Sequence, residues 1–551
     1  MVLAWGLSNN LEQELLRARI ADRLGDEAAA VLMPPSGRSG GGSNAWVLSG
    51  SRTVSGKPLL ANDPHLPTLH PSPWMPFELR APGYSARGVA LTFSPGITLG
   101  ATTRHAWGAT NVTGDVQDLF IVSERDVLTV REELITVRGE GEPRMHRVRE
   151  TRHGPIVERV PVGVTAKTWE GLDRTLALRW TGAEHGLRPS IAFEVAAATS
   201  FREFRRAVLQ IGAPGQNFVY ADVQGHIGYQ LTGAYPVRTS GDGARPLPDH
   251  GWDGWVPAEE LPWLEDPDEG MIVTANDAQH AARSLHLIST DFHAPNRADR
   301  IRELLLARPR HDAASLAALQ RDTVSLAARG AIPALLARTV ASAARREALD
   351  LLAAWDHDLA ADSKAASIYQ AWIRAIARGA LSERLGEDLY RAYTAQVETW
   401  SCTVLPALLH DASDAWFDDS LLGGVLDEAI EALGRPIPVW GERHRLVLAH
   451  PLSRIPGLES FFTALDVQVG GDEQTIAQAA LDEGAGPFVA IAPSWRAVWD
   501  LADPGESRTL LPTGVSGNPT SPHWNDQADL FAGAKGPPPS DAPGTLTLDP
   551  A

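Results

Sequence analysis

The chain contains one cysteine, Cys402, among 551 residues. A single cysteine excludes an intrachain disulfide, a thiol pair and a metal site built on several thiolates. Cys402 lies in TWSCTVLPALL, an apolar stretch of helical pattern that favours a buried, unreactive thiol over a nucleophile. The cysteine content leaves the compartment of the protein open.

Positive charge is also scarce. The chain has 49 Lys and Arg against 68 Asp and Glu, which gives a formal net charge of −19. Binding to phosphate backbones or anionic lipids needs a positive field, so this balance argues against nucleic acid and membrane surfaces as partners. It is compatible with chemistry on small molecules.

Long apolar runs are absent. No stretch approaches 18 uncharged apolar residues, so we expect no membrane span. The start, MVLAWGLSNNLEQE, has no basic segment followed by an apolar one, so we expect no signal peptide. With 44% hydrophobic residues, the chain can still bury a large core.

The residues that are present fall into successive patterns. Residues 10–33 have apolar side chains at helical spacing and predict one or two short helices. Short β-rich runs separated by turn residues occupy 46–160, and a helix is predicted over 191–208. Ala- and Leu-rich helical runs fill about 297–435, after which strands return. We find no internal repeat, and this order favours one α+β sandwich with a largely helical insertion.

The stretch from Gly40 to Leu66, GGGSNAWVLSGSRTVSGKPLLANDPHL, is the main candidate for a reactive site. Its glycines let the chain fold back, so that the Ser43 hydroxyl can reach the Gly42 carbonyl and displace the amide through an ester. Such a cut puts a hydroxyl and an α-amine, with a pKa of about 8, on one residue, and the amine can act as the base. The following residues predict a hairpin with Ser43 at a strand tip. Taken alone, the Gly/Ser run is also typical of a solvated linker.

A second serine of this run has a motif around it. Gly37 to Gly41 match the G-x-S-x-G pattern, with Ser39 at its centre. That motif needs a buried strand before it and a helix after it, whereas here prolines precede and more glycines follow. We interpret the match as accidental, and we rank an esterase that uses Ser39 last among the hypotheses.

Several segments of the chain resemble the penicillin acylase family of N-terminal nucleophile hydrolases. The matching segments, in chain order, are GSNAW (42–46) with SGKPLLANDPHL after it, WGATNVTGDVQDLF (107–120), TGAYPVR (232–238), VTANDA (273–278), NRADRI (296–301), GGDEQT (470–475) and PTGVSGNPTSPHWNDQ (512–527). They cover nearly the whole chain, and their common order makes the resemblance far more specific than any one motif.

The resemblance implies a four-layer αββα sandwich and a precursor that cuts itself before Ser43. Residues 1–33 would then be a helical remnant of the light chain, 34–42 a short spacer, and 43–551 the heavy chain, with the two chains associated after the cut. Ser43 would be the nucleophile, with its own α-amine acting as base through a water. His65 stands where family members carry His or Gln and would hold that amine; on its own it is also typical of a turn cap.

The resemblance implies three further catalytic residues. An amide's tetrahedral intermediate carries negative charge that needs fixed donors. The side-chain amide of Asn276 and the backbone N–H of Asn111 would supply them, although each asparagine is also typical of a turn. Arg300 would orient Asn276 and favour the free-amine form of the Ser43 terminus, whereas an isolated helical arginine is usually a paired surface charge.

A structural calcium ion is implied as well. Asp115, Gln117 and Asp118 form a short loop with oxygen ligands of the hard type that calcium prefers. Glu14 and Asp291 align with the remaining acidic ligands, the latter only with a gap. Two carboxylates in a loop are otherwise most often solvated.

The resemblance is weakest at the front of the chain. Family precursors carry an export signal and a longer light chain, and they are usually periplasmic or extracellular, so the compartment here is unknown. The leading hypothesis is a self-processing amidohydrolase that acts on an N-acyl amide: a penicillin or cephalosporin, an N-acyl homoserine lactone or an acyl peptide. The alternative is a non-maturing, inactive family remnant that acts as a binding or scaffold protein.

Overall fold

The computed structural model describes residues 2–35, 41–92, 94–158, 166–169, 174–186, 188, 190–248, 251–395, 399–410, 416–481, 486–503 and 507–533. Ser39, with most of the expected spacer, lies outside these residues. No helix in the described part of the chain is long and apolar enough to cross a bilayer.

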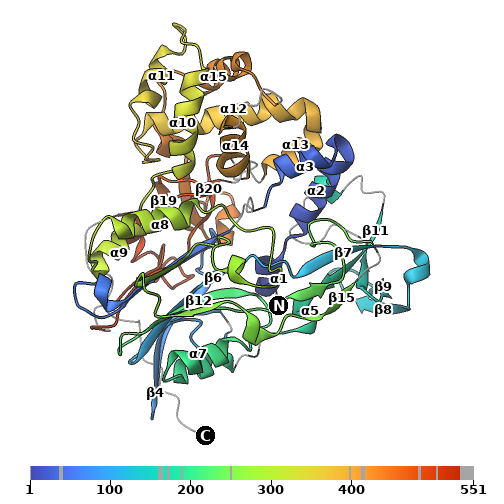
Figure 1. The fold of residues 1–551 in the computed structure, drawn as a ribbon, viewed down its shortest axis with the longest axis vertical. Helices are drawn as coiled ribbons and strands as arrows, with labels where there is room; N and C mark the ends of the chain where they lie inside the picture. The colour runs from blue at the N-terminus through green and yellow to red at the C-terminus, as the bar shows by residue number, and fades with distance from the viewer. Residues whose placement is uncertain are drawn as a thin grey trace.

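Two seven-stranded antiparallel sheets pack face to face at the centre of the molecule (Figure 1). The first sheet comprises β1 (Ser43–Leu48), β2 (Leu59–Pro67), β17 (Met271–Thr274), β20 (Ala480–Leu481), β21 (Val489–Pro493), β22 (Arg496–Asp500) and β23 (Arg508–Leu510). The second comprises β3 (Trp74–Ala81), β4 (Tyr84–Leu91), β5 (Leu99–Thr102), β6 (His105–Asn111), β12 (Gln216–Asp222), β13 (Ile227–Leu231) and β16 (Trp263–Glu265). In the first sheet, β1 lies between β17 and β2.

Strand β1 is buried on both faces, which explains its unbroken apolar sequence. Ala45 and Val47 point into the core between the two sheets, whereas Trp46 and Leu48 point into the core under the outer helices. Successive side chains of a strand face opposite sides, so a strand covered on both sides is apolar at every position. This double burial fixes the strand that carries Ser43.

Helices cover the outer faces of both sheets. α8 (Asn296–Leu306) and α9 (Ala313–Leu319) contact the first sheet, and α6 (Ile191–Ala197) and α7 (Phe201–Val208) contact the second. The layers therefore run helix, sheet, sheet, helix. The predicted αββα sandwich is confirmed.

A helical body stands beside the sandwich, at the top of Figure 1. Its helices are α10 (Leu326–Arg338), α11 (Arg346–Ala353), α12 (Lys364–Leu385), α13 (Glu387–Thr394), α14 (Leu405–His410) and α15 (Asp419–Leu433). The N-terminal helices are α1 (Val2–Ser8), α2 (Leu11–Leu24) and α3 (Asp26–Leu32). Leu16 and Ile20 of α2 join the apolar core of the helical body, so the N-terminal segment is part of the folded structure.

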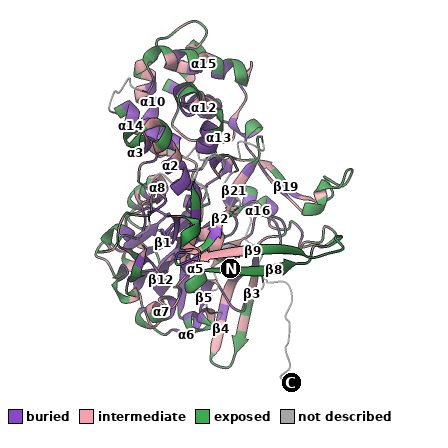
Figure 2. Ribbon diagram, turned by 90° about the vertical axis from the view of Figure 1, so that its right-hand side faces the viewer, coloured by how far each residue is buried: buried purple, intermediate pink, exposed green. Residues whose placement is uncertain are grey.

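A third sheet extends from the sandwich. It has five strands: β7 (Gln117–Val122), β8 (Thr129–Ile135), β9 (Arg144–Thr151), β10 (Gly154–Val157) and β11 (Thr175–Trp180). Figure 2 shows β8 and β9 largely exposed or half-buried, whereas the sandwich interior is buried. The small elements are β14 (Pro236–Arg238), β15 (Trp252–Trp255), β18 (Arg445–Ala449), β19 (Thr463–Gln468), α4 (Ala166–Trp169), α5 (Thr181–Glu184) and α16 (Ala528–Ala532).

The helices differ from the sequence-based prediction in two details. The predicted helix 191–208 is two helices, because the Ser200 side chain accepts a hydrogen bond from the Glu203 N–H and starts α7 as a new helix. The helices α8 and α9 lie within the predicted insertion 297–435 but form the outer layer over the first sheet. Their apolar faces are needed there, since Trp46 and Leu48 of β1 would otherwise be exposed.

Candidate active site

Ser43 is the first residue of β1 and lies beside Pro64 of β2. It is 7% exposed. Its backbone N–H donates to Asn276 Oδ1 at 2.7 Å, and its carbonyl oxygen accepts from Arg297 Nη1 at 2.9 Å. Both backbone groups of Ser43 are therefore held by side chains, in a water-poor setting where such contacts are strong.

Asn276 lies two residues after the end of β17, where the chain turns out of the strand. Its φ is +69°, a left-handed conformation that asparagine tolerates better than most residues. Because the strand ends there, the side-chain amide lies beside Ser43. Its Nδ2 donates to the Asn111 carbonyl at 2.8 Å, and its second amide hydrogen has no partner in the described structure. Asn276 thus lies beside Ser43 with a donor available, as the oxyanion role requires.

Arg300 is not brought to the site. Its guanidinium pairs with Asp322 at 2.8 Å and with Glu303 at 3.2 Å. The arginine that contacts Asn276 is Arg297, at 3.0 Å from Oδ1. Arg297 lies one helical turn earlier on α8, and residues one turn apart share a helix face. The prediction that Arg300 orients Asn276 is therefore wrong, and Arg297 takes that position.

His65 does not hold the Ser43 amine in this structure. Its Nε2 lies 2.8 Å from Asp63 Oδ2, and its Nδ1 lies 2.7 Å from Gln478 Oε1. Asp63 and His65 are two apart on β2 and share a face of the sheet, so the imidazole meets this carboxylate. The Ser43 N–H points to Asn276 instead. Neither Asp63 nor Gln478 was singled out from the sequence.

Asn111 ends β6, and its carbonyl is the group that contacts Asn276. Its side chain donates from Nδ2 to the Leu7 carbonyl at 2.8 Å, which ties α1 to the site. No contact of the Asn111 backbone N–H supports the oxyanion role expected for it.

The five predicted calcium ligands lie in one buried seam between α2 and the third sheet. Asp118 is bound by Arg238, at 2.9 and 3.1 Å. Asp115 Oδ1 accepts from Asn10 at 2.8 Å and lies 3.0 Å from Arg238. Asp291 pairs with Arg17 at 2.7 Å, and Glu14 Oε1 accepts from the Leu119 N–H at 3.1 Å.

The donor set of this seam fits a hard cation in type. Glu14 Oε2, Asp115 Oδ2, Asp291 Oδ2 and Gln117 Oε1 are buried without a hydrogen-bond partner. Four carboxylates face two guanidinium groups, which leaves two formal negative charges. Burial, followed by the charges of Asp118 and Asp115, raises the pKa of Glu14 well above its usual range. Across the described residues, however, no three His, Cys, Asp or Glu side chains converge as a formed metal centre.

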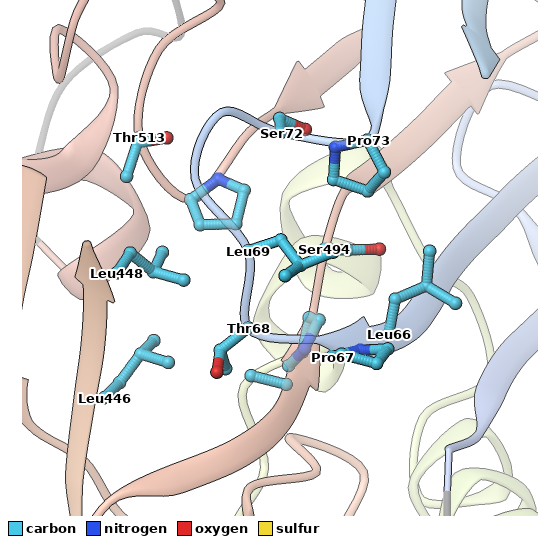
Figure 3. A pocket seen from close by; sticks show the side chains of 13 residues that line it. Leu66, Pro67, Thr68, Leu69, Ser72, Pro73, Leu446, Leu448, Ser494 and Thr513 are labelled. Atoms are coloured by element: carbon cyan, nitrogen blue, oxygen red, sulfur yellow. The ribbon is translucent and has the colours of Figure 1, made fainter. Parts of the chain in front are cut away.

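A small cavity lies close to the site, with a lining that begins one residue after His65 (Figure 3). Leu66, Leu446 and Leu448 line it together with Ser494 and Thr513. Its volume is about 10 Å³, comparable to one water. Larger grooves, of about 720 and 1110 Å³, lie over α12 and α7 and contain none of the site residues. None of these cavities identifies the acyl group.

The site combines a buried serine at a strand tip, an asparagine at its backbone nitrogen and an arginine that binds both. The penicillin amidase family model matches residues 1–538. The chain therefore belongs to the penicillin amidase family, whose characterised members hydrolyse linear amides.

Among its relatives is penicillin acylase 2 proenzyme of Pseudomonas sp. strain SE83, 30% identical over 532 residues, which cover 89% of this chain and 66% of that protein. Acyl-homoserine lactone acylase QuiP of Pseudomonas aeruginosa is 28% identical over 89% of this chain and 65% of its own length. The chain thus spans slightly less than two thirds of these relatives.

The fold has a solved counterpart in a thermostable penicillin G acylase from Alcaligenes faecalis. The superposition covers 92% of this chain and 100% of that chain, with a TM-score of 0.65 at 17% identity. At this identity the likeness concerns the fold alone, and it agrees with the αββα layers described above.

Proposed function

We propose that this protein is a self-processing amidohydrolase that cleaves N-acyl amides through an acyl-enzyme on Ser43. The observation that carries the proposal is the setting of Ser43, whose backbone nitrogen lies 2.7 Å from Asn276 Oδ1. A cut before Ser43 turns that nitrogen into an α-amine, already held beside its own hydroxyl. Membership of the penicillin amidase family supports the same reaction class.

In the proposed reaction the α-amine, through a water, takes the proton of Ser43 Oγ as the oxygen attacks the acyl carbon. The negative charge on the acyl oxygen is stabilised by the second amide hydrogen of Asn276. The proton passes to the leaving amine, and an ester remains on Ser43. Water then hydrolyses this ester and releases the acid. The proposed substrate is of penicillin, cephalosporin, acyl-homoserine lactone or acyl-peptide type, and the names of the relatives support the first and third of these.

After the cut, residues 1–42 are expected to stay bound to the rest of the chain. Leu16 and Ile20 are fully buried in the helical body, and Arg17 forms a buried ion pair with Asp291. Burial of each large apolar side chain contributes about 2 kcal/mol. The finished enzyme would therefore consist of two associated chains.

The test is intact mass spectrometry of the purified protein with N-terminal sequencing of each piece. We expect a large fragment that starts at Ser43 and, with N-octanoyl and N-phenylacetyl 4-nitroanilides as probes, hydrolysis that Ser43→Ala abolishes. Ser39→Ala is the matched control and should behave like the parent. A single uncut chain with no turnover would contradict the proposal and favour the non-maturing scaffold.

We also propose that the seam of Glu14, Asp115, Gln117, Asp118 and Asp291 binds one structural calcium ion. The unpartnered oxygens and the two surplus negative charges support it. Calcium at 1 mM should raise the midpoint of thermal unfolding, and Asp115→Asn should reduce that rise. Asp266→Asn, at an exposed carboxylate outside the seam, is the control. Equal midpoints with calcium and with EDTA would contradict the ion.

A further inference from the structure

The pairing of β1 with β2 continues one residue beyond β1. The His65 backbone N–H donates to the Gly42 carbonyl oxygen at 2.8 Å. Gly42 and His65 are therefore a hydrogen-bonded pair, and the next pair, Ser43 and Pro64, is a non-hydrogen-bonded one. Consequently the N–H and C=O of Ser43 point away from β2, toward Asn276 and Arg297.

This alternation gives one peptide bond a hydrogen-bond donor at its carbonyl oxygen and an acceptor at its nitrogen. The bond between Gly42 and Ser43 has its carbonyl oxygen on the His65 N–H. Its nitrogen donates to Asn276 Oδ1 at 2.7 Å. Among the described contacts of β1, no other peptide bond combines a ladder donor at its carbonyl with an active-site side chain at its nitrogen. β17 ends at Thr274, opposite Ala45, and Asn276, two residues further on, lies at the level of Ser43.

We propose that the His65 backbone N–H stabilises the oxyanion that forms when the chain cuts itself between Gly42 and Ser43. The proposal rests on the self-processing proposed above. It assigns to His65 a catalytic role through its backbone, whereas the imidazole is bound to Asp63 and Gln478.

In this step Ser43 Oγ attacks the Gly42 carbonyl carbon, and the C=O electron pair moves onto the oxygen. The His65 N–H faces the Gly42 oxygen on which this negative charge develops. Because the donor is already in place before the reaction, it stabilises the charge without reorganisation. When the carbonyl re-forms, the bond from Gly42 to the Ser43 nitrogen breaks. The Oγ proton goes to that nitrogen, and water then hydrolyses the ester to a Gly42 carboxylate and the free Ser43 hydroxyl.

Space around Gly42 supports the same role. A Cβ at this position would lie 2.8 Å from Gln478 Oε1 and 2.9 Å from Arg297 Nη2. The Gln478 oxygen is fixed, since it accepts from His65 Nδ1 at 2.7 Å while Gln478 Nε2 donates to the Glu473 carbonyl at 2.9 Å. A side chain would displace the Gly42 carbonyl from the His65 N–H, so glycine keeps the scissile carbonyl on its donor.

The alternative is that this contact is an ordinary sheet hydrogen bond with no part in the cut. The two can be separated by replacing the N–H with an ester oxygen, which removes the donor and keeps the shape. His65→lactic acid, introduced by a chemically acylated suppressor tRNA, is compared with His65→Ala, which lacks the imidazole but keeps the N–H. Ala61→lactic acid is the control. It removes one hydrogen bond between the same two strands, at the pair of Trp46 and Ala61, which is the second hydrogen-bonded pair after Gly42 and His65.

The readout is the rate at which the full chain separates into two pieces, followed by mass spectrometry. We expect His65→lactic acid to cut about 100-fold more slowly than His65→Ala, by analogy with the loss of one oxyanion donor. Ala61→lactic acid should cut at the parent rate. Hydrolysis of N-octanoyl 4-nitroanilide, counted per cut chain, should be the same in both His65 variants.

Equal cutting rates for the two His65 variants would overturn the proposal. So would an equal drop in cutting and in hydrolysis per cut chain, because the hydrogen bond would then serve the fold and not the cut. A parent chain that never cuts would instead contradict the proposed function itself.

Discussion

At the scale of single residues, Arg297 links the parts of the candidate site. Its guanidinium donates to the Ser43 carbonyl, to Asn44 Oδ1 and to Asn276 Oδ1, all within 3.0 Å, and it is fully buried. The planar fork of an arginine suits three such acceptors in fixed directions. Its charge also disfavours the ammonium form of a nearby amine.

We therefore predict that Arg297→Met shifts the pH dependence of amide hydrolysis. Loss of the positive charge raises the pKa of the Ser43 α-amine, so less of the free amine is present at a given pH. The acidic limb of the kcat profile should move to higher pH, and kcat at pH 7 should fall roughly 10- to 100-fold. The measurement is kcat against pH, normalised to the amount of cut chain.

The control is Arg300→Met, three residues further on α8. Arg300 pairs with Asp322 and Glu303 and contacts neither Ser43 nor Asn276. Its variant should keep the parent pH profile. An acidic limb that moves in the Arg300 variant and stays in the Arg297 variant would reverse this assignment.

Some of the site residues could be predicted from the sequence, and others, such as Arg297, could not. Ser43 was predicted from the Gly/Ser run before a predicted hairpin together with the family resemblance, and Asn276 from the resemblance alone. NRADRI contains two arginines one turn apart on the same face of α8, and the sequence cannot tell which of them is level with Asn276. Gln478 was missed because its contact with His65 joins residues 413 positions apart. Asp63 lies two residues before His65 on β2, but it was not singled out although alternate residues of a strand share a face.

At the scale of elements, α2 carries a buried polar face toward the third sheet and the loop that contains Asp291. Glu14 and Arg17 lie on it, and Asn10, just before its first turn, donates to Asp115 Oδ1. Arg17 Nη2 pairs with Asp291 at 2.7 Å, with both side chains under 10% exposed, and its Nη1 donates to the Ala244 carbonyl. A buried charge that loses its partner costs several kcal/mol.

Arg17→Met should therefore lower the free energy of unfolding by about 3–5 kcal/mol, because Asp291 is left buried without its partner. Adding Asp291→Asn should restore part of this loss. The measurement is denaturant unfolding of the uncut Ser43→Ala chain in EDTA, so that neither cutting nor calcium contributes.

Arg23→Met, on the exposed side of the same helix, is the matched control. It should change the free energy of unfolding by less than about 0.5 kcal/mol. If Arg17→Met were equally mild, the ion pair would not be what holds α2 to the sandwich.

The elements themselves were easier to predict than their places. The helices within 10–33 and the hairpin of β1 and β2 were confirmed, since periodicity and turn residues are local signals. α8 and α9 were assigned to the helical insertion because their sequences resemble those of α10 to α15. Only the tertiary structure assigns them to the sandwich, where they bury Trp46 and Leu48 on the outer face of β1.

At the scale of the whole molecule, the described chain has two large apolar cores. One core fills the sandwich and the other fills the helical body. Leu16 and Ile20 of α2 belong to the core of the helical body, whereas Arg17 on its polar face pairs with Asp291 in the loop before α8. The N-terminal segment therefore connects the two bodies, and its loss would affect both. This arrangement explains why a chain cut before Ser43 is expected to remain one molecule.

Within the sandwich core, His105 makes the stability of the molecule depend on pH. It is 1% exposed, its Nε2 lies 3.1 Å from the Val195 carbonyl and its Nδ1 lies 3.2 Å from Thr102 Oγ1. A neutral imidazole satisfies both contacts, donating to the carbonyl and accepting from the hydroxyl. Burial lowers the pKa of His105 to about 4, against an opposing contribution from Asp222.

The native state therefore binds fewer protons than the unfolded state, in which histidine titrates near 6.5. The contribution of the neutral His105 side chain to the free energy of unfolding is complete above about pH 6.5 and is lost as the pH falls toward 4. Between pH 7 and 5 the parent should lose about 2 kcal/mol more than His105→Gln, whose amide can still donate to the Val195 carbonyl. Denaturant unfolding of both proteins at the two pH values measures this difference, and the other histidines cancel because both proteins contain them. Equal losses would mean that His105 binds the same number of protons in the folded and unfolded proteins, so that burial does not lower its pKa.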